Sequence, residues 1–227
     1  MRYIIMSTVV RKYLMAITGL ALVAFVICHL LGNLTFYTSN GTATNTYAAF
    51  LESMGILLVI VEVGLFSVIG LHIITSLWIT YENWTARPLK YKVSGNKGGS
   101  HNSIFSRNMI ILGILLLVFL SIHVRQFQFG PGIKEGYMTQ VHGEAVRDLY
   151  RLVIETFKKP LNVGFYVVCM FLLGFHLRHG FWSAFQSLGA LNPKFSKLVN
   201  VFAIALAIVL AAGFLFIPIW IYFGGSA

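Results

Sequence analysis

Five long apolar stretches constrain the fold of this chain more than any other feature of its sequence. An α-helix needs about 20 apolar residues to cross the hydrocarbon core of a bilayer, which is ~30 Å thick. Spanning segments must also satisfy their own backbone hydrogen bonds, and helices do so within one segment. We therefore predict five transmembrane helices, at residues 13–31, 56–79, 109–127, 161–181 and 198–222.

The composition agrees with a membrane protein. Of the 227 residues, 57% are hydrophobic and 11% are charged, which is more apolar and less charged than a soluble domain of this length. Basic residues precede the first stretch as they do in a signal peptide, but the stretch is longer than a signal h-region and four more follow. We expect it to be retained, and residues 1–227 to form a single transmembrane domain.

The distribution of Lys and Arg predicts the orientation of the helices. Eleven of them lie before the first stretch, in the 81–107 loop or in the 178–197 segment, which five alternating spans place on one side. The other side has six, all within residues 125–160, where four acidic residues offset them. Since cytoplasmic loops carry excess Lys and Arg, we predict a multi-pass protein of the cell inner (cytoplasmic) membrane with a cytoplasmic N-terminus. This bias accounts for the net charge of +10, and we therefore predict no nucleic acid partner.

Two segments between the spans differ in character. Residues 33–55 are rich in Thr, Asn and Gly and are expected to form a loop. Residues 144–157, "EAVRDLYRLVIETF", space their apolar residues as a helix does, with charges on the opposite face. We predict a short amphipathic helix there, lying on the outer membrane surface.

Histidines occur singly in four different spans. They are His29, His72, His123 and His176, and His179 is a fifth candidate. Ionisable groups are costly in lipid and mostly face the bundle interior or a cofactor, so each is a functional hypothesis. At 1.5 Å of rise per residue, His29 and His123 lie near the outer face, whereas His72 and His176 lie in the inner half. The depths predict two pairs.

Local motifs repeat the pairing by depth. His72 and His176 share G-x-H-x5-W, in "GLHIITSLW" and "GFHLRHGFW", and His29 and His123 share F-x3-H, in "FVICH" and "FLSIH". The tryptophan register favours His176 over His179 as the partner of His72. The helical wheel leaves both open, because three residues separate them by only ~60°.

Two facing imidazoles at one depth suit an iron held between two axial nitrogens, as in bis-histidine haem. The chain has no C-x-x-C-H motif, so the haem would be of the non-covalent b type. Zinc would need three or four ligands at one point. We therefore predict an all-α membrane protein with five transmembrane helices in a haem-binding bundle plus a short outer amphipathic helix. Two haem b groups, ~13 Å apart along the membrane normal, would let an electron cross.

Four segments carry a family resemblance: "RKYLMAITGLALVAFVICHLLGNLTFY", "NTYAAFLESMG", "GLHIITSLW" and "HLRHGFWSAFQSLG". They are similar to the five-helix, dihaem cytochrome b subunit of succinate dehydrogenases and fumarate reductases, over nearly all five spans. The resemblance implies that His29 and His123 hold the outer haem and that His72 and His176 hold the inner one. It also implies flavoprotein and iron–sulfur subunits docked at the cytoplasmic face, and electron exchange with a quinone, commonly menaquinone.

Further polar residues are candidates for binding the cofactors. Glu62 is either a proton acceptor beside a quinol site or an acid hydrogen-bonded to a neighbouring helix. Arg125 and Arg178 are candidates to pair with haem propionates, with headgroup anchoring as the alternative. His179 either donates to a propionate or extends toward the inner interface.

The expected function is that of the membrane anchor of a succinate:quinone oxidoreductase, respiratory complex II, with no dicarboxylate chemistry of its own. Two alternatives stay open. One is a dihaem, quinone-reactive cytochrome b of another membrane dehydrogenase, which the co-purifying subunits would reveal. The other is a haem-free transporter or anchor that uses its histidines for proton relay, which would show no Soret band.

Overall fold

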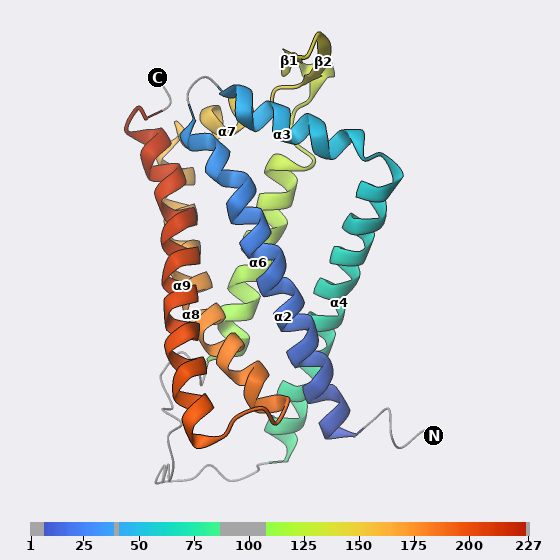
Figure 1. Cartoon of the computed structure of the whole chain (residues 1–227), viewed down its shortest axis with the longest axis vertical. Helices are drawn as coiled ribbons and strands as arrows, with labels where there is room; N and C mark the ends of the chain where they lie inside the picture. The colour runs from blue at the N-terminus through green and yellow to red at the C-terminus, as the bar shows by residue number, and fades with distance from the viewer. Residues whose placement is uncertain (1–6, 39–40, 87–107, 226–227) are drawn as a thin grey trace.

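The computed structural model describes residues 7–38, 41–86 and 108–225, and within these ranges five long helices run up and down in one bundle (Figure 1). All five are long and apolar enough to cross a membrane. The prediction of an all-α, multi-pass membrane protein is thereby confirmed. The helices are α2 (Thr8–Asn33), α4 (Ile56–Thr85), α6 (Met109–Phe127), α8 (Pro160–Ser187) and α9 (Pro193–Tyr222).

Polar caps explain why several of these helices extend beyond the apolar stretches. The Ser7 side chain accepts a hydrogen bond from the Val10 amide at 3.2 Å, so α2 begins well before residue 13. α8 and α9 each begin with a proline, whose missing N–H costs nothing in a first turn. Helix α6 coincides with the predicted stretch.

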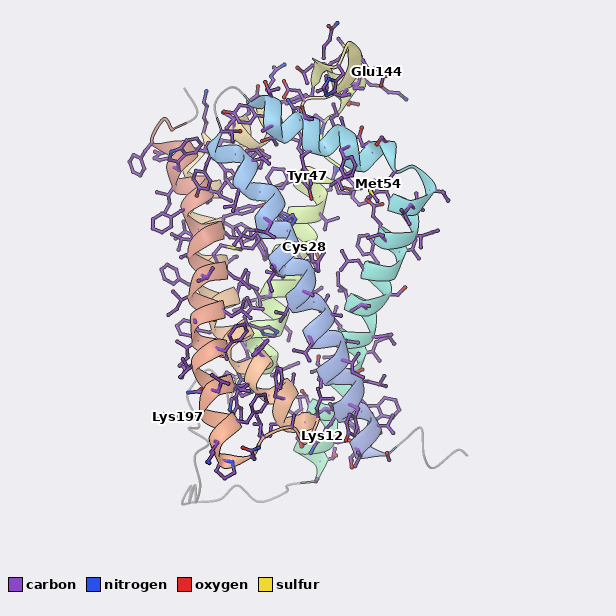
Figure 2. The ribbon with its side chains drawn as sticks, viewed as in Figure 1. Lys12, Cys28, Tyr47, Met54, Glu144 and Lys197 are labelled. Atoms are coloured by element: carbon purple, nitrogen blue, oxygen red, sulfur yellow. The ribbon has the colours of Figure 1, made fainter. Side chains whose placement is uncertain are left out.

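Helix α2 begins at one end of the bundle and helix α9 finishes at the other (Figure 1). We call them the N-terminal end, where α2 begins, and the C-terminal end, where α9 finishes. Lys12 and Lys197 lie at the N-terminal end, and Glu144 projects at the other (Figure 2). Arg2 and most of the basic 81–107 loop fall outside the described residues, so the cytoplasmic location of the N-terminus stays a prediction.

Short elements cover the C-terminal end, and one of them corrects the sequence analysis. Residues 33–55 were expected to form a loop, but they contain a three-turn helix that lies across the top of the bundle (Figure 1). It follows Gly41, whose φ of 71° makes the sharp turn out of the preceding segment. The elements are η1 (Leu34–Tyr37), α3 (Thr42–Ser53), η3 (Ile133–Glu135), β1 (Met138–Val141), β2 (Glu144–Arg147) and α7 (Leu149–Phe157).

The predicted amphipathic helix begins later than the sequence suggested. Residues 144–147 form β2, which pairs antiparallel with β1 across a two-residue turn. That turn is His142 and Gly143, and their φ angles of 54° and 86° are those of a tight hairpin turn. Helix α7 starts only after Asp148, whose side chain accepts from the Arg151 amide at 3.0 Å.

The apolar face of α7 packs on the bundle, and its position at the outer membrane surface stays a prediction. Leu152, Val153, Ile154 and Phe157 are all buried, and the last three belong to the main hydrophobic core. The ring of Phe157 lies 4.9 Å from that of Tyr166 on α8. Helix α7 therefore closes the C-terminal end of the bundle.

Helix α4 stands apart from the rest of the bundle. Thr75 is its only buried residue within the described chain, and the helix packs mainly along α2. By contrast, α8 and α9 approach closely, because a Cβ atom on Gly174 would lie 3.0 Å from that of Ala211. Most of α4 thus presents apolar side chains outward, where a membrane protein meets lipid.

Candidate functional site

Two of the candidate histidines lie side by side in the half of the bundle nearer its C-terminal end. The ring centroids of His29 on α2 and His123 on α6 are 5.8 Å apart, and the rings are nearly perpendicular. Phe25 stacks on His29 at 5.5 Å, and Phe119 lies 5.6 Å from His123. These phenylalanines are the first residues of the F-x3-H motifs, one helical turn before each histidine.

Further aromatic side chains, from α6, α8 and α9, pack against this pair. The ring centroid of Phe214 on α9 lies 5.6 Å from that of His29, and the ring centroid of Phe127 lies 5.2 Å from that of His123. Tyr166 of α8 lies 6.1 Å from His123. Four helices therefore surround two imidazoles with apolar rings, and such surroundings strengthen every polar interaction inside them.

The hydrogen bonds of Tyr166 identify the protonated nitrogen of His123. The Tyr166 hydroxyl donates to the Gln126 side-chain oxygen at 2.6 Å and lies 3.4 Å from His123 Nδ1. A tyrosine has one hydroxyl hydrogen, so a bond between Tyr166 and His123 must use a hydrogen on Nδ1. In a neutral ring, Nε2 of His123 then keeps its lone pair.

The same reasoning applies to His72 on α4. Its Nδ1 lies 3.1 Å from the hydroxyl oxygen of Thr18 on α2. That hydroxyl donates its hydrogen to the Leu14 carbonyl at 2.7 Å, one turn back along α2. Thr18 is buried, and with its hydrogen used in that bond, a hydrogen bond to His72 would come from Nδ1–H and leave the lone pair on Nε2.

His176 on α8 is the predicted partner of His72. The structure places it within electrostatic range of both His72 and His179. Its Nδ1 is buried and has no hydrogen-bond partner among the described residues. An unpaired buried nitrogen is costly in a native protein and is a mark of sites that hold something else.

Two glycines of neighbouring helices face these rings. A Cβ atom on Gly19 of α2 would lie 3.4 Å from Cε1 of His72, and one on Gly113 of α6 would lie 3.9 Å from Cε1 of His176. Backbone and not side chain thus borders both imidazoles, as a flat macrocycle would require. Gly32, in contrast, would meet the ring of Tyr47 and serves helix packing.

The two histidine pairs lie about ten residues apart along three helices. Because an α-helix rises 1.5 Å per residue, the pairs are separated by ~15 Å along the bundle, close to the spacing predicted from the sequence. The intervals are Thr18 to His29 on α2, Gly113 to His123 on α6 and Tyr166 to His176 on α8.

These residues fit the group that the sequence predicts. Each pair brings imidazoles from two helices to one depth, and one ring of each pair has a free Nε2. Among the described residues no three His, Cys, Asp or Glu side chains gather as ligands of one ion. Haem needs two axial nitrogens and a flat space beside them, and the glycines supply room at the His72 pair.

The remaining predicted site residues lie farther from the pairs. Glu62 accepts a hydrogen bond from the Gln128 side chain at 3.1 Å, which links α4 to the end of α6. Arg125 is exposed and donates to the Phe129 carbonyl at 3.3 Å. Arg178 is exposed and His179 is half-buried. Their roles toward a quinone or propionates stay predictions.

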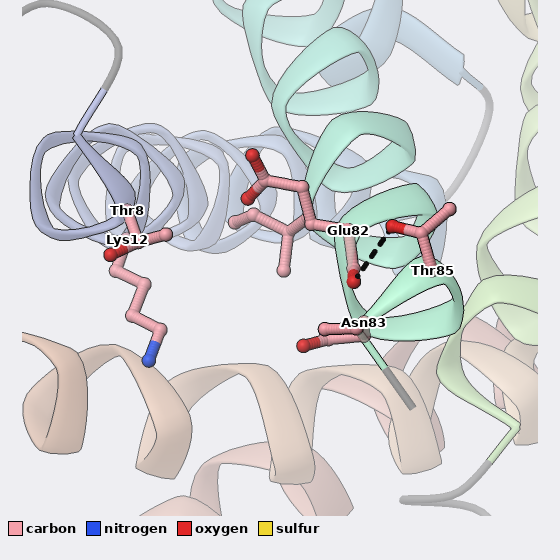
Figure 3. A pocket seen from close by; sticks show the side chains of 7 residues that line it. Thr8, Lys12, Glu82, Asn83 and Thr85 are labelled. Atoms are coloured by element: carbon pink, nitrogen blue, oxygen red, sulfur yellow. Dashed lines mark hydrogen bonds between the residues drawn. The ribbon is translucent and has the colours of Figure 1, made fainter. Parts of the chain in front are cut away.

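A second polar cluster lies at the N-terminal end. Arg11 is buried, bonds to the Glu82 carboxylate at 2.7 Å and lies over the ring of Trp78 at 4.9 Å. A pocket of about 480 Å³ opens beside it between α2 and α4, with Lys12 and Glu82 on its two sides (Figure 3). None of the candidate histidines lines this pocket, whose full lining is Thr8, Lys12, Ile79, Glu82, Asn83, Thr85 and Ala86.

Sequence reasoning missed Thr18, Gln126 and Tyr166. Their contacts cross between helices, and a single sequence does not give the rotation of one helix against another. The sequence does show one regularity: Tyr166 lies ten residues before His176, and Gly113 lies ten residues before His123.

No known protein family, no curated protein and no solved structure matches this chain. The resemblance seen in the sequence therefore stays a prediction. What the chain does is argued from the geometry of the histidine pairs.

Proposed function

We propose that this chain is the membrane-anchor, dihaem cytochrome b subunit of a succinate:quinone oxidoreductase. It would pass electrons between an iron–sulfur subunit and a membrane quinone, menaquinone by the resemblance. The observation that carries the proposal is the arrangement of four histidines from four helices as two pairs, ~15 Å apart along the bundle.

Each histidine has a defined part in this proposal. His29 and His123 would hold one haem b, and His72 and His176 the other. A bound haem supplies one-electron chemistry at its iron. The chain holds the imidazoles in place, and aromatic rings pack against His29 and His123. The groups around such a centre are the means by which a protein sets its potential.

The architecture favours the N-terminal end as the face for the flavoprotein and iron–sulfur partners. Thr18, the contact of His72, lies ten residues from the start of α2, or ~15 Å from that end of the helix. The other end is covered by α3 and α7. The dicarboxylate reaction would belong to the partners, and Glu62 remains the candidate proton acceptor for a quinol.

The test is a pyridine haemochrome assay on the purified, detergent-solubilised complex, with the haem-to-protein ratio and the masses of the accompanying subunits. Two haems b per chain, together with flavoprotein and iron–sulfur subunits, are expected. His142→Ala, in the exposed hairpin turn, serves as the control and should keep both haems. Two haems with other subunits would assign the chain to another dehydrogenase, and no haem would overturn the proposal.

A further inference from the structure

We propose that Thr18 and Tyr166 are positioning residues, one for each haem. Each would accept a hydrogen bond from Nδ1 of one histidine, so that Nε2 of His72 and of His123 is unprotonated and turned toward its iron. The inference rests on the proposed function, and it assigns to two hydroxyl groups a role that neither the histidine motifs nor the family resemblance supplied.

The case for Thr18 rests on where its hydrogen goes. The hydroxyl lies 2.7 Å from the Leu14 carbonyl and 3.2 Å from the Met15 carbonyl, and neither carbonyl oxygen can donate. Toward His72 Nδ1, at 3.1 Å, the hydroxyl is therefore an acceptor. Thr18 is only 5% exposed, so no water competes for this contact.

The case for Tyr166 has the same form. Its hydrogen goes to Gln126 at 2.6 Å, the shorter of its two contacts, and its oxygen lone pair faces His123 Nδ1 at 3.4 Å. The ring of Tyr166 is held between Phe157 at 4.9 Å and Phe119 at 5.2 Å. A buried ring packed against two others cannot readily turn its hydroxyl away from His123.

The other member of each pair has no such acceptor. His176 Nδ1 has no hydrogen-bond partner in the described chain. Among the described residues, the ring nitrogens of His29 have one hydrogen-bond neighbour, the Asn33 amide nitrogen, a donor from the same helix, at 3.5 Å. In each pair, one ring contacts a hydroxyl on a neighbouring helix through Nδ1, and the other ring does not. The two rings with a hydroxyl contact, His72 and His123, lie at different levels of the bundle.

An Nδ1–H bonded to an oxygen makes the opposite nitrogen a better donor to a metal. A stronger donor favours the oxidised iron, so loss of the hydroxyl should raise the midpoint potential of the haem concerned. Thr18→Val should raise the potential of the haem held by His72, and Tyr166→Phe that of the haem held by His123. The variants keep the size of each side chain and, in each, the second haem should be unchanged.

The experiment is a redox titration of the visible haem bands in the intact complex, with the haem content of each variant. Three further variants sharpen it. Thr18→Ser restores the hydroxyl and should restore the potential. Thr75→Val removes a buried hydroxyl that bonds only to the Leu71 carbonyl, and should leave both potentials unchanged. Gln126→Leu frees the Tyr166 hydrogen and should shift the same haem as Tyr166→Phe.

The outcomes separate this inference from the proposed function. A shift of one haem in Thr18→Val and of the other in Tyr166→Phe supports it, as does selective loss of that one haem. Two haems whose potentials stay as in the unmodified chain in both variants would overturn the inference alone, as would one haem shifting in both. A chain that binds no haem would overturn the inference and the proposed function together.

Discussion

A histidine binds a metal through a nitrogen that carries no hydrogen, so at the scale of single residues the partners of Nδ1 matter as much as the position of the ring. The proposed roles of Thr18 and Tyr166 follow from this, because each hydroxyl has another acceptor for its hydrogen, the Leu14 carbonyl or the Gln126 side chain. The sequence predicted the four histidines and their pairing by depth, since these follow from rise per residue. It did not predict the hydroxyl partners.

The histidine pairs predict how haem content responds to substitution. His29→Ala or His123→Ala should lower the haem content from two per chain to about one, and His72→Ala or His176→Ala should remove the other haem, because a bis-histidine iron needs both nitrogens. The haem-to-protein ratio and the two sets of redox bands measure this. His179→Ala should keep both haems. Loss of a haem in His179→Ala with retention in His176→Ala would contradict the assignment.

At the scale of elements, a polar cluster joins the β-hairpin to α7. Tyr137 donates to Glu155 at 2.5 Å, and Arg151 donates to the other carboxylate oxygen at 2.7 Å. The bond from Tyr137, followed by that from Arg151, lowers the pKa of Glu155, and the same carboxylate raises the pKa of Tyr137. Arg151 is exposed, and Tyr137 and Glu155 are half-buried. Because Tyr137 and Glu155 both titrate, this joint depends on pH.

The stability of the joint should be lost on both sides of neutral pH. Because the pKa of Glu155 is lowered, its contribution to the stability of the joint is complete above pH 4.5, its ordinary pKa. That contribution is lost as the pH falls through the pKa of Glu155 in the folded protein. Because the pKa of Tyr137 is raised, its contribution to the stability of the joint is complete below pH 10.0, its ordinary pKa. That contribution is lost as the pH rises through the pKa of Tyr137 in the folded protein. Hydrogen exchange of the hairpin amides, corrected for intrinsic rates, should show protection falling at both limits.

Glu155→Gln tests the assignment, because an amide does not titrate. It should abolish the change on the acid side, whereas the matched variant Glu144→Gln at the hairpin turn should keep it. If the protection of the hairpin amides still falls at acid pH in Glu155→Gln, another group is responsible.

Gly213 sets how closely α9 approaches α2. A Cβ atom there would lie 2.7 Å from the Leu30 side chain, and the next residue, Phe214, lies against the His29 ring. Gly213→Val should lower the free energy of unfolding by about 1–3 kcal/mol through overpacking. Gly164→Val on α8 is the control, because an added Cβ atom there would have no neighbour within 4 Å. It should change the free energy of unfolding by less than about 0.5 kcal/mol. Thermal unfolding in mild detergent measures both, and equal losses would refute this view of Gly213.

At the scale of the whole molecule, hydropathy alone predicted five spans, because lipid requires each crossing to be long, apolar and helical. The same rule does not apply outside the membrane, which is why α3 and the β-hairpin were missed. Residues 144–147 have apolar spacing that suits a helix, but pairing with β1 overrides it. Local pattern decides structure only where the surroundings leave no alternative.

An odd number of crossings places the two ends of the chain on opposite sides of the membrane (Figure 1). With the predicted orientation, a fluorescent protein fused before Met1 should fluoresce, and alkaline phosphatase fused after Ala227 should be active. Swapping the two reporters should silence both. Activity of one reporter at both ends would contradict five crossings, and the inverted pattern would contradict the orientation predicted from Lys and Arg.

The interval of about ten residues between the two histidine levels has a consequence for which changes of length the chain tolerates. One inserted residue turns everything beyond it by about 100° and moves it 1.5 Å along the axis. Between Gly113 and His123, or between Tyr166 and His176, such an insertion would keep one level in register and misplace the other. The number of residues in these intervals is therefore constrained separately from their identity, whereas a change of length in a connection at the end of the bundle leaves both intervals intact.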